Sequence, residues 1–302
     1  MKAIRMAYNG VRALYHKYNA ETTYREILKK VKNEFPQYTN TIGENINFAS
    51  IHEGKRCFIF GNGPSLSSID FSLFQSEYVF TVNRMAKNID FIKLRTNYHF
   101  WVDPQFFEID PTKSEDKQLL DAMKNVNTND NKPVCFYPIE HIDFVKKYNL
   151  DAENEVHFIW LDRINDLDGN IRIDFTKQIP GFHTVVQYAI AMAIYMGFSE
   201  IYLLGCDTTG ILTNINEHLK KDEQLYAYEI SEDEKKLIHR MASKYYLEEH
   251  AYSFYMTLKG YHLLANYCER NGIKLINCSS ETLIDTVKRM RLNEVLTSNT
   301  DV

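Results

Sequence analysis

The sequence predicts an α/β protein of the Rossmann-like type: a mostly parallel sheet flanked by helices, with an N-terminal helical extension and a lid segment. Its short apolar runs are continuous and do not alternate with polar residues, which is typical of parallel strands buried on both faces. Helical segments lead directly into such runs, as in βαβ units. The first run ends abruptly in the sequence GNGPSL, a pattern typical of turns that approach a phosphate closely.

The predicted organisation has three parts. Residues 1–52 form the helical extension, residues 53–285 the Rossmann-like domain, and residues 286–302 a C-terminal tail. Residues 208–246 are polar and irregular, and a stretch of this length inside a compact domain is typical of a lid or binding segment. The basic amphipathic start of the tail fits either contact with anionic lipid or a solvated helix face.

Strands and helices are expected in alternation along the domain. The expected strands are residues 56–60, 78–82, 98–102, 134–137, 156–160, 201–204 and 274–277. The strongest helix is predicted for residues 184–196, where apolar residues recur at helical spacing before Gly197. A second helix is predicted for residues 251–269. Each of these helices leads into a strand.

Composition excludes several classes of function. The 302 residues are 44% hydrophobic and 25% charged, which is enough apolar material for one large core. With a net charge of -5 and a pI near 6.1, the protein has no overall positive potential to attract a polyanion. Nucleic acid is therefore not an expected partner. We expect neither a secretion signal nor a membrane-spanning segment, because residues 1–18 mix charged and aromatic residues and no apolar run approaches about 20 residues. We therefore expect a cytoplasmic protein, with peripheral contact with the inner membrane and self-association left open.

The five cysteines are scattered, odd in number and contain no CxxC pair. Several lie inside apolar runs, where a free thiol behaves as a small buried hydrophobe. This pattern indicates free thiols and a reducing compartment.

The turn after the first strand is the first candidate site. Gly61 and Gly63 allow a tight turn that brings amide N–H groups against a phosphate, while Asn62 and Ser65 add polar contacts. The turn has neither the Gly-Lys-Ser/Thr of an ATPase loop nor GxGxxG spacing. The alternative is an ordinary glycine turn between a strand and a helix.

Other candidates end the later strands, because ligands of open parallel sheets bind beyond the carboxyl ends of the strands. These residues are Asn83, Asp103, Asp162 and Asp207. For Asp207, a contact with ribose or a metal competes with a structural role as a turn cap.

Several of these residues together resemble a known family. The GNGPSL turn followed by Ile69-Asp70, Asn83 after the second strand, and the segment AIAMAIYMGFSEIYLLGCD resemble the bacterial monofunctional sialyltransferases that build surface oligosaccharides. They also resemble the related superfamily of hydroxymethylpterin-diphosphokinase-like proteins and flagellin-modifying nonulosonate transferases. The resemblance covers roughly residues 56–280.

The resemblance implies that residues 53–285 are a nucleotide-sugar-binding catalytic domain, with residues 208–246 as its lid and acceptor segment. The implied activity is that of an inverting glycosyltransferase of lipopolysaccharide or capsule biosynthesis. It would move sialic acid or another nonulosonic acid from a CMP-sugar donor to a surface glycan acceptor, with no metal or other cofactor.

The resemblance also implies roles for individual residues. The implied nucleotide-binding residues are Gly61, Asn62, Gly63, Pro64, Ser65, Asn83, Asp103 and Asp207, and the implied donor-sugar residues are Gly181, His183 and Thr184. At Asp103 the family has Asn. A helix start such as Thr184 favours an anion. For His183, the alternative is a satisfied buried histidine.

The general base of the family is a histidine near the start of the helix that precedes the last core strand. Residue type and the helix start favour His250, whereas direct counting from that strand reaches Tyr255. Histidine is suited to take a hydroxyl proton near neutral pH. The alternative for His250 is an ordinary helix-start residue.

Tyrosines donate hydrogen bonds to the departing phosphate in that family. Tyr245, Tyr246 and Tyr252 are candidates, and packing is the alternative for each because the chain has 20 tyrosines.

Two other functions stay open. ATP-dependent diphosphate transfer to a pterin alcohol would require Mg²⁺ held by carboxylates such as Asp103 and Asp207. A non-catalytic scaffold would keep the fold without using His250 or Asn83.

Overall fold

The computed structural model describes residues 35–297, except 125, 127–131, 163–166, 168, 170, 220–231, 233, 234 and 236–245. The helices expected before residue 35, most of the predicted lid and Tyr245 lie outside the described residues. The division into residues 1–52, 53–285 and 286–302 stays a prediction.

The described residues form one sheet of nine parallel strands, in the order β6-β5-β4-β3-β2-β1-β7-β8-β9. The strands are β1 Arg56–Phe60, β2 Tyr78–Val82, β3 Tyr98–Phe100, β4 Val134–Pro138, β5 Glu155–Leu161, β6 Gln178–Ile179, β7 Glu200–Leu204, β8 Lys274–Asn277 and β9 Lys288–Arg289. The sheet confirms the predicted Rossmann-like class.

Helices and short 3₁₀ turns connect the strands. The described α-helices are α2 Phe35–Gly43, α3 Ser114–Lys124, α4 Ile142–Lys147, α5 Val185–Tyr195, α6 Gly210–Leu219, α8 Leu247–Arg270 and α9 Leu292–Thr297. The 3₁₀ turns are η1 Glu44–Phe48, η2 Pro64–Ser68, η3 Phe71–Phe74, η4 Asn83–Lys87, η5 Ile89–Lys93, η6 Pro104–Phe107 and η7 Ile139–His141.

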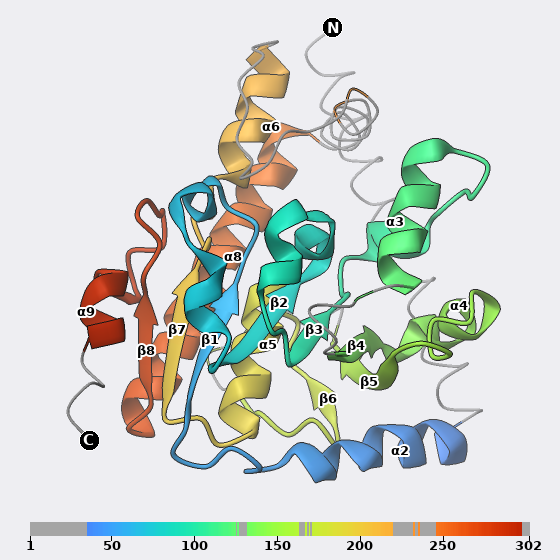
Figure 1. Cartoon of the computed structure of the whole chain (residues 1–302), viewed down its shortest axis with the longest axis horizontal. Coiled ribbons are helices and arrows are strands. Elements are labelled where there is room, and N and C mark those ends of the chain that lie inside the picture. The colour runs from blue at the N-terminus through green and yellow to red at the C-terminus, as the bar shows by residue number, and fades with distance from the viewer. Residues whose placement is uncertain are drawn as a thin grey trace, which may run out of the picture.

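The sheet is the middle of three layers (Figure 1). Successive side chains of a strand point to opposite faces, so Cys57 and Ile59 of β1 pack with helices α5 and α8. Phe58 and Phe60 pack on the other face with the 3₁₀ turns, α3 and α9. Burial on both faces explains why the strand sequences are continuously apolar.

The direction of strand addition reverses beside β1. The chain adds β2 to β6 outward on one side, then returns through α5 to place β7 on the other side, where Arg56 pairs with Glu200 and Phe60 with Leu204. The carboxyl ends of β1 and β7 therefore lie side by side at the topological switch point. Open α/β sheets bind their ligands in the crevice at this point.

Three local expectations were wrong. Residues 210–219 form helix α6, where an irregular segment was expected. The two-residue strands β6 and β9 were not expected, because two residues carry no periodic signal. The tail is accordingly not a single basic helix face: Lys288 and Arg289 pair with β8 before α9 begins.

Two other findings concern the cysteines and membrane spans. All five cysteines are buried and free, as expected. Of the helices in the described part of the chain, none is long and apolar enough to cross a membrane.

Candidate functional site

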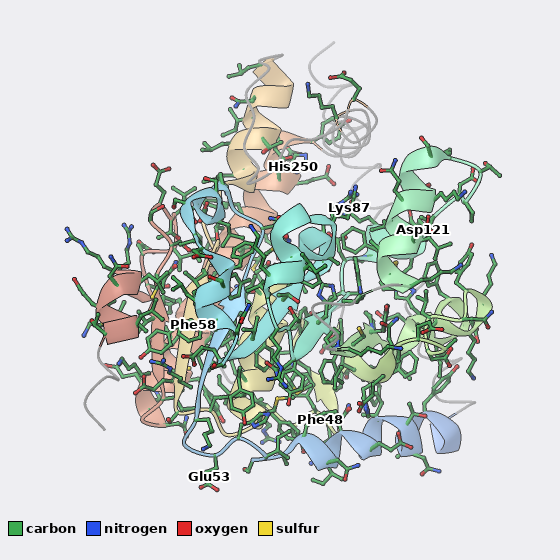
Figure 2. The ribbon with its side chains drawn as sticks, viewed as in Figure 1. Phe48, Glu53, Phe58, Lys87, Asp121 and His250 are labelled. Atoms are coloured by element: carbon green, nitrogen blue, oxygen red, sulfur yellow. The ribbon has the colours of Figure 1, made fainter. Side chains whose placement is uncertain are left out.

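A cavity of about 370 Å³ lies at the switch point of the sheet. Its walls come from the turn after β1, the end of β2, the segment after β7, the start of α5, α6 and the first half of α8. Figure 2 shows His250 at the end of the sheet where Figure 1 places α6, far from Phe48 and Glu53 at the opposite end. The cavity is thus at the expected edge of the sheet.

The turn after β1 is mostly satisfied by protein. The Gly61 amide donates to the carbonyl of Leu204 at 2.7 Å, and the Gly63 amide donates to that of Gly205 at 2.8 Å. These bonds continue the ladder between β1 and β7 beyond the strands. The Ser65 and Leu66 amides also donate within the protein.

Among the described residues, none accepts a hydrogen bond from the Asn62 amide, which is therefore the only N–H of this turn left for a ligand. The expectation that the amides of the whole turn face a phosphate was wrong. Asn62 itself borders the cavity, and its side chain donates to the Val82 carbonyl at 3.3 Å.

Close packing against the β7 end explains both glycines. A Cβ on Gly61 would lie closer than 3.0 Å to the Gly205 carbonyl oxygen, and a Cβ on Gly63 would lie 2.7 Å from the same atom. Real Cβ atoms do not tolerate such approaches to a backbone. The two glycines therefore allow the turn after β1 to pack against the backbone after β7, and this packing requires glycine even without a ligand.

Asp207 braces this junction. Its carboxylate accepts from the Ser65 amide at 2.8 Å and from the Ser65 hydroxyl. The side chain is only 1% exposed, and burial raises the pKa of this carboxyl, partly opposed by the Ser65 hydrogen bonds. The structure thus favours the turn cap over a ligand contact, and its ligand role stays a prediction.

The segment after β7 has an unusual backbone. Thr208 has a φ of 58°, which is rare for a β-branched residue, and it lines the cavity. The buried Tyr261 of α8 lines the same cavity. Strained residues of this kind cluster at ligand sites because the surrounding structure holds them.

The start of α5 is open toward the cavity. The first-turn amides of any α-helix have no intrahelical acceptor, and Thr184, the N-cap, makes no side-chain cap bond. Thr184, Val185 and Val186 all line the cavity. The positive end of the helix dipole therefore favours an anion at this wall.

A second cavity of about 210 Å³ adjoins the first. The two share Asn83, Thr184 and Val185, and the second also contains Asp103 and His183 between apolar walls. The Asp103 carboxylate caps η6 by accepting from the Gln105 amide at 3.2 Å. Asn83, with a φ of 49°, accepts from the Val102 amide at 3.3 Å and lines both cavities.

Helix α8 contributes a face that sequence reasoning missed, apart from His250. The residues of this face are His250, Ser253, Phe254, Thr257 and Tyr261. Their spacing of three, four, seven and eleven residues places them on one side of a helix. This polar periodicity beside a candidate base was the signal that could have identified them.

The remaining candidates fall in different places. Of the described candidates, Pro64, Ser65, Asp162, Asp207, Gly181 and Tyr246 do not line either cavity. Tyr246 precedes α8, and its amide donates to Glu249 at 2.7 Å. The Tyr252 ring lies 6.4 Å from that of His183. Tyr255 is exposed and lines neither cavity, so the position favours His250 over Tyr255.

The described residues contain no group of three or more His, Cys, Asp or Glu side chains arranged to hold a metal ion. Of the two carboxylates considered for Mg²⁺, Asp103 lines the second cavity, whereas Asp207 is bonded to Ser65 and lines neither cavity.

These features define a class: a parallel α/β protein with a ligand site at the switch point of its sheet. The sheet order and the cavity between β1, β7 and α5 carry this assignment. Residues 22–210, more than half of the chain, match the family described as 6-hydroxymethylpterin diphosphokinase MptE-like, and the chain belongs to this MptE-like family. The family confirms the superfamily expected from the sequence.

A similar solved structure is that of the sialyltransferase CstII from Campylobacter jejuni in complex with a substrate analogue, cytidine-5'-monophosphate. The similarity covers 80% of this chain and 86% of that chain, with 18% sequence identity and a TM-score of 0.42. Similarity at this level does not carry function, so the function is argued from this chain's own residues. No curated protein matches the chain.

Proposed function

We propose that this protein is an inverting glycosyltransferase that moves sialic acid or another nonulosonic acid from a CMP-sugar donor to a surface glycan acceptor. One observation carries the proposal: the open start of α5 and the imidazole of His250 border the same cavity at the switch point. Such a donor has two anionic groups, a phosphate and a carboxylate, and the transfer needs one base for the acceptor hydroxyl.

The two cavities suit the two parts of the donor. The apolar walls of the second cavity, with Asp103 at its edge, suit a nucleoside. The phosphate would lie where the cavities meet, beside Asn83 and the first turn of α5. The larger cavity, bordered by Thr208, Ser253 and His250, would then hold the donor sugar and the acceptor hydroxyl.

In the proposed reaction, His250 takes the proton of the acceptor hydroxyl while that oxygen bonds to the anomeric carbon from the face opposite the phosphate. The bond to the phosphate oxygen breaks, CMP leaves with both bonding electrons, and the anomeric centre inverts. Donors beside the phosphate stabilise the charge that develops on it. No metal is required in this scheme.

The MptE-like family also supports a second candidate, ATP-dependent diphosphate transfer to a pterin alcohol. That reaction needs Mg²⁺ against the transferred phosphates. The described residues do not fit this requirement, because Asp103 is the only carboxylate among those that line the two cavities.

Calorimetry with CMP, CDP, UDP and ATP, each with and without Mg²⁺, separates the candidates. We expect CMP to bind without Mg²⁺ and binding to weaken at least tenfold in Asn83→Ala. His250→Ala should keep its affinity for CMP within about threefold of the parent protein. Its rate of CMP release from a CMP-nonulosonate donor should fall by ~100-fold or more. Its matched control is His262→Ala, an exposed histidine on the same helix. If ATP binds only with Mg²⁺ and CMP does not bind, the proposed transferase function is wrong.

A further inference from the structure

One buried amide connects the two walls that the proposed function uses. Gln187 in the first turn of α5 is fully buried. Its Oε1 accepts from the His183 amide at 3.2 Å, and its Nε2 donates to the Thr257 carbonyl of α8 at 2.6 Å. The carbonyl oxygen and the NH₂ group of this side chain are therefore both hydrogen-bonded, one to each wall of the cavity.

The packing around Gln187 is correspondingly tight. A Cβ on Gly260 of α8 would lie 2.6 Å from the Gln187 amide atoms. Glycine at this position lets α8 approach α5 closely enough for the bond to Thr257. The contact is thus supported from both helices.

The two hydrogen-bond partners of Gln187 both belong to residues that line the cavities. His183 lines the second cavity and precedes Thr184, which lines both. Thr257 lies two turns after His250 on the cavity face of α8. A chain of hydrogen bonds thus runs from the proposed anion wall through Gln187 to the helix that carries the proposed base.

We propose that Gln187 is a positioning residue, which sets the distance between the start of α5 and His250. The proposal rests on the proposed function. Gln187 lies behind the cavity walls and does not touch a ligand; it acts through His183 and through α8. Misplacement of a reacting group by about 1 Å can cost on the order of 100-fold in rate.

Gln187→Glu separates the two bonds at pH values where the new carboxyl is ionised, because a carboxylate still accepts from the His183 amide but cannot donate to the Thr257 carbonyl. Burial favours the protonated form, which can donate, so the variant is assayed over a range of pH and the loss should grow as the pH rises. We expect kcat to fall about 10- to 100-fold while KM for the donor stays within about threefold. Gln187→Met removes both bonds, and we expect donor KM to rise as well.

The matched control is Asn45→Asp. Asn45 is also fully buried, and its amide donates to the Phe158 and Phe175 carbonyls at 2.8 and 3.0 Å, away from both cavities. It should lose stability without losing kcat per folded molecule. If Gln187→Glu keeps the kcat of the parent protein, or if Asn45→Asp loses as much, the positioning role is wrong.

Hydrogen exchange provides a readout that does not need turnover. CMP should protect amides of both the α5 start and the middle of α8 in the parent protein, and only the α5 start in Gln187→Glu. Equal protection of α8 in both proteins would overturn the inference, whereas no protection by CMP anywhere would overturn the proposed function instead.

If the single variants fail to fold, a double variant, Gln187→Ala with Gly260→Ala, replaces them. Removal of the Gln187 amide leaves space that the new methyl group at position 260 fills. This pair should fold and show the same loss of kcat and of α8 protection. A folded pair with the kcat of the parent protein would contradict the role.

Discussion

Two segments border the same cavity and differ in how their backbones are satisfied. The glycine turn after β1 donates its amides at residues 61, 63, 65 and 66 to protein, whereas the start of α5 has no side-chain cap at Thr184. The glycines that mark a binding turn in the sequence serve here to pack two backbones together. The inconspicuous helix start is the more open of the two.

The largest expected effect comes from Gly61→Ala. Its Cβ would meet the Gly205 carbonyl, so we expect a loss of about 3 kcal/mol or more in the free energy of unfolding, measured by urea denaturation. Gly43→Ala is the control, since no atom lies within 4 Å of its Cβ. Normal stability with lost nucleotide binding would show instead that the glycine serves the ligand.

Asp207→Ala tests the brace of the same turn. Loss of both bonds to the buried junction should cost about 2–3 kcal/mol of unfolding free energy in denaturant titrations. Asp70 makes the same pair of bonds to Ser72 on the exposed surface, so Asp70→Ala should cost clearly less. Equal losses would contradict the structural role of burial at Asp207.

Thr184→Asp tests the open helix start. A carboxylate at the N-cap should raise the unfolding free energy by about 1 kcal/mol, because it supplies the missing cap. The same charge should weaken nucleotide binding at least tenfold, as measured by calorimetry. Thr184→Asn caps the helix without the charge, and it should keep more of the affinity. Unchanged affinity in Thr184→Asp would place the anion elsewhere.

The smallest expected effect is a pH dependence at the glycine turn. Burial raises the pKa of Asp207 above 3.8, so the folded state holds the proton more tightly than the unfolded state. Its contribution to stability is fully present below pH 3.8 and is lost as the pH rises through the folded pKa. The stability of the parent protein relative to Asp207→Asn should therefore fall as the pH rises from about 4 to 7. A rise over this interval would mean that the Ser65 bonds outweigh burial.

The sequence predicted most of the sheet because strands buried on both faces are continuously apolar. The runs at 56–60 and 78–82 coincide with β1 and β2. Helix α6 has Ile211, Leu212, Ile215 and Leu219 at helical spacing, and it was missed because it lies in a segment whose overall composition is polar. Strand β9 was missed because it is two residues long.

The site was less predictable than the sheet. The closeness of Gly61 to Gly205, and of Gln187 to Gly260, depends on residues far apart in the chain. A sequence shows that glycine is present but not what its missing side chain makes room for. The polar face of α8 was readable in principle, since its spacing is helical.

The position of β1 in the middle of the sheet bears on how the chain is made. Residue 56 pairs with residue 200, so one edge of β1 stays open during synthesis until β7 has left the ribosome. An open apolar strand edge invites association with other chains. The nascent protein thus passes through an aggregation-sensitive interval, and chaperone binding should be greatest for chains arrested between β6 and β7.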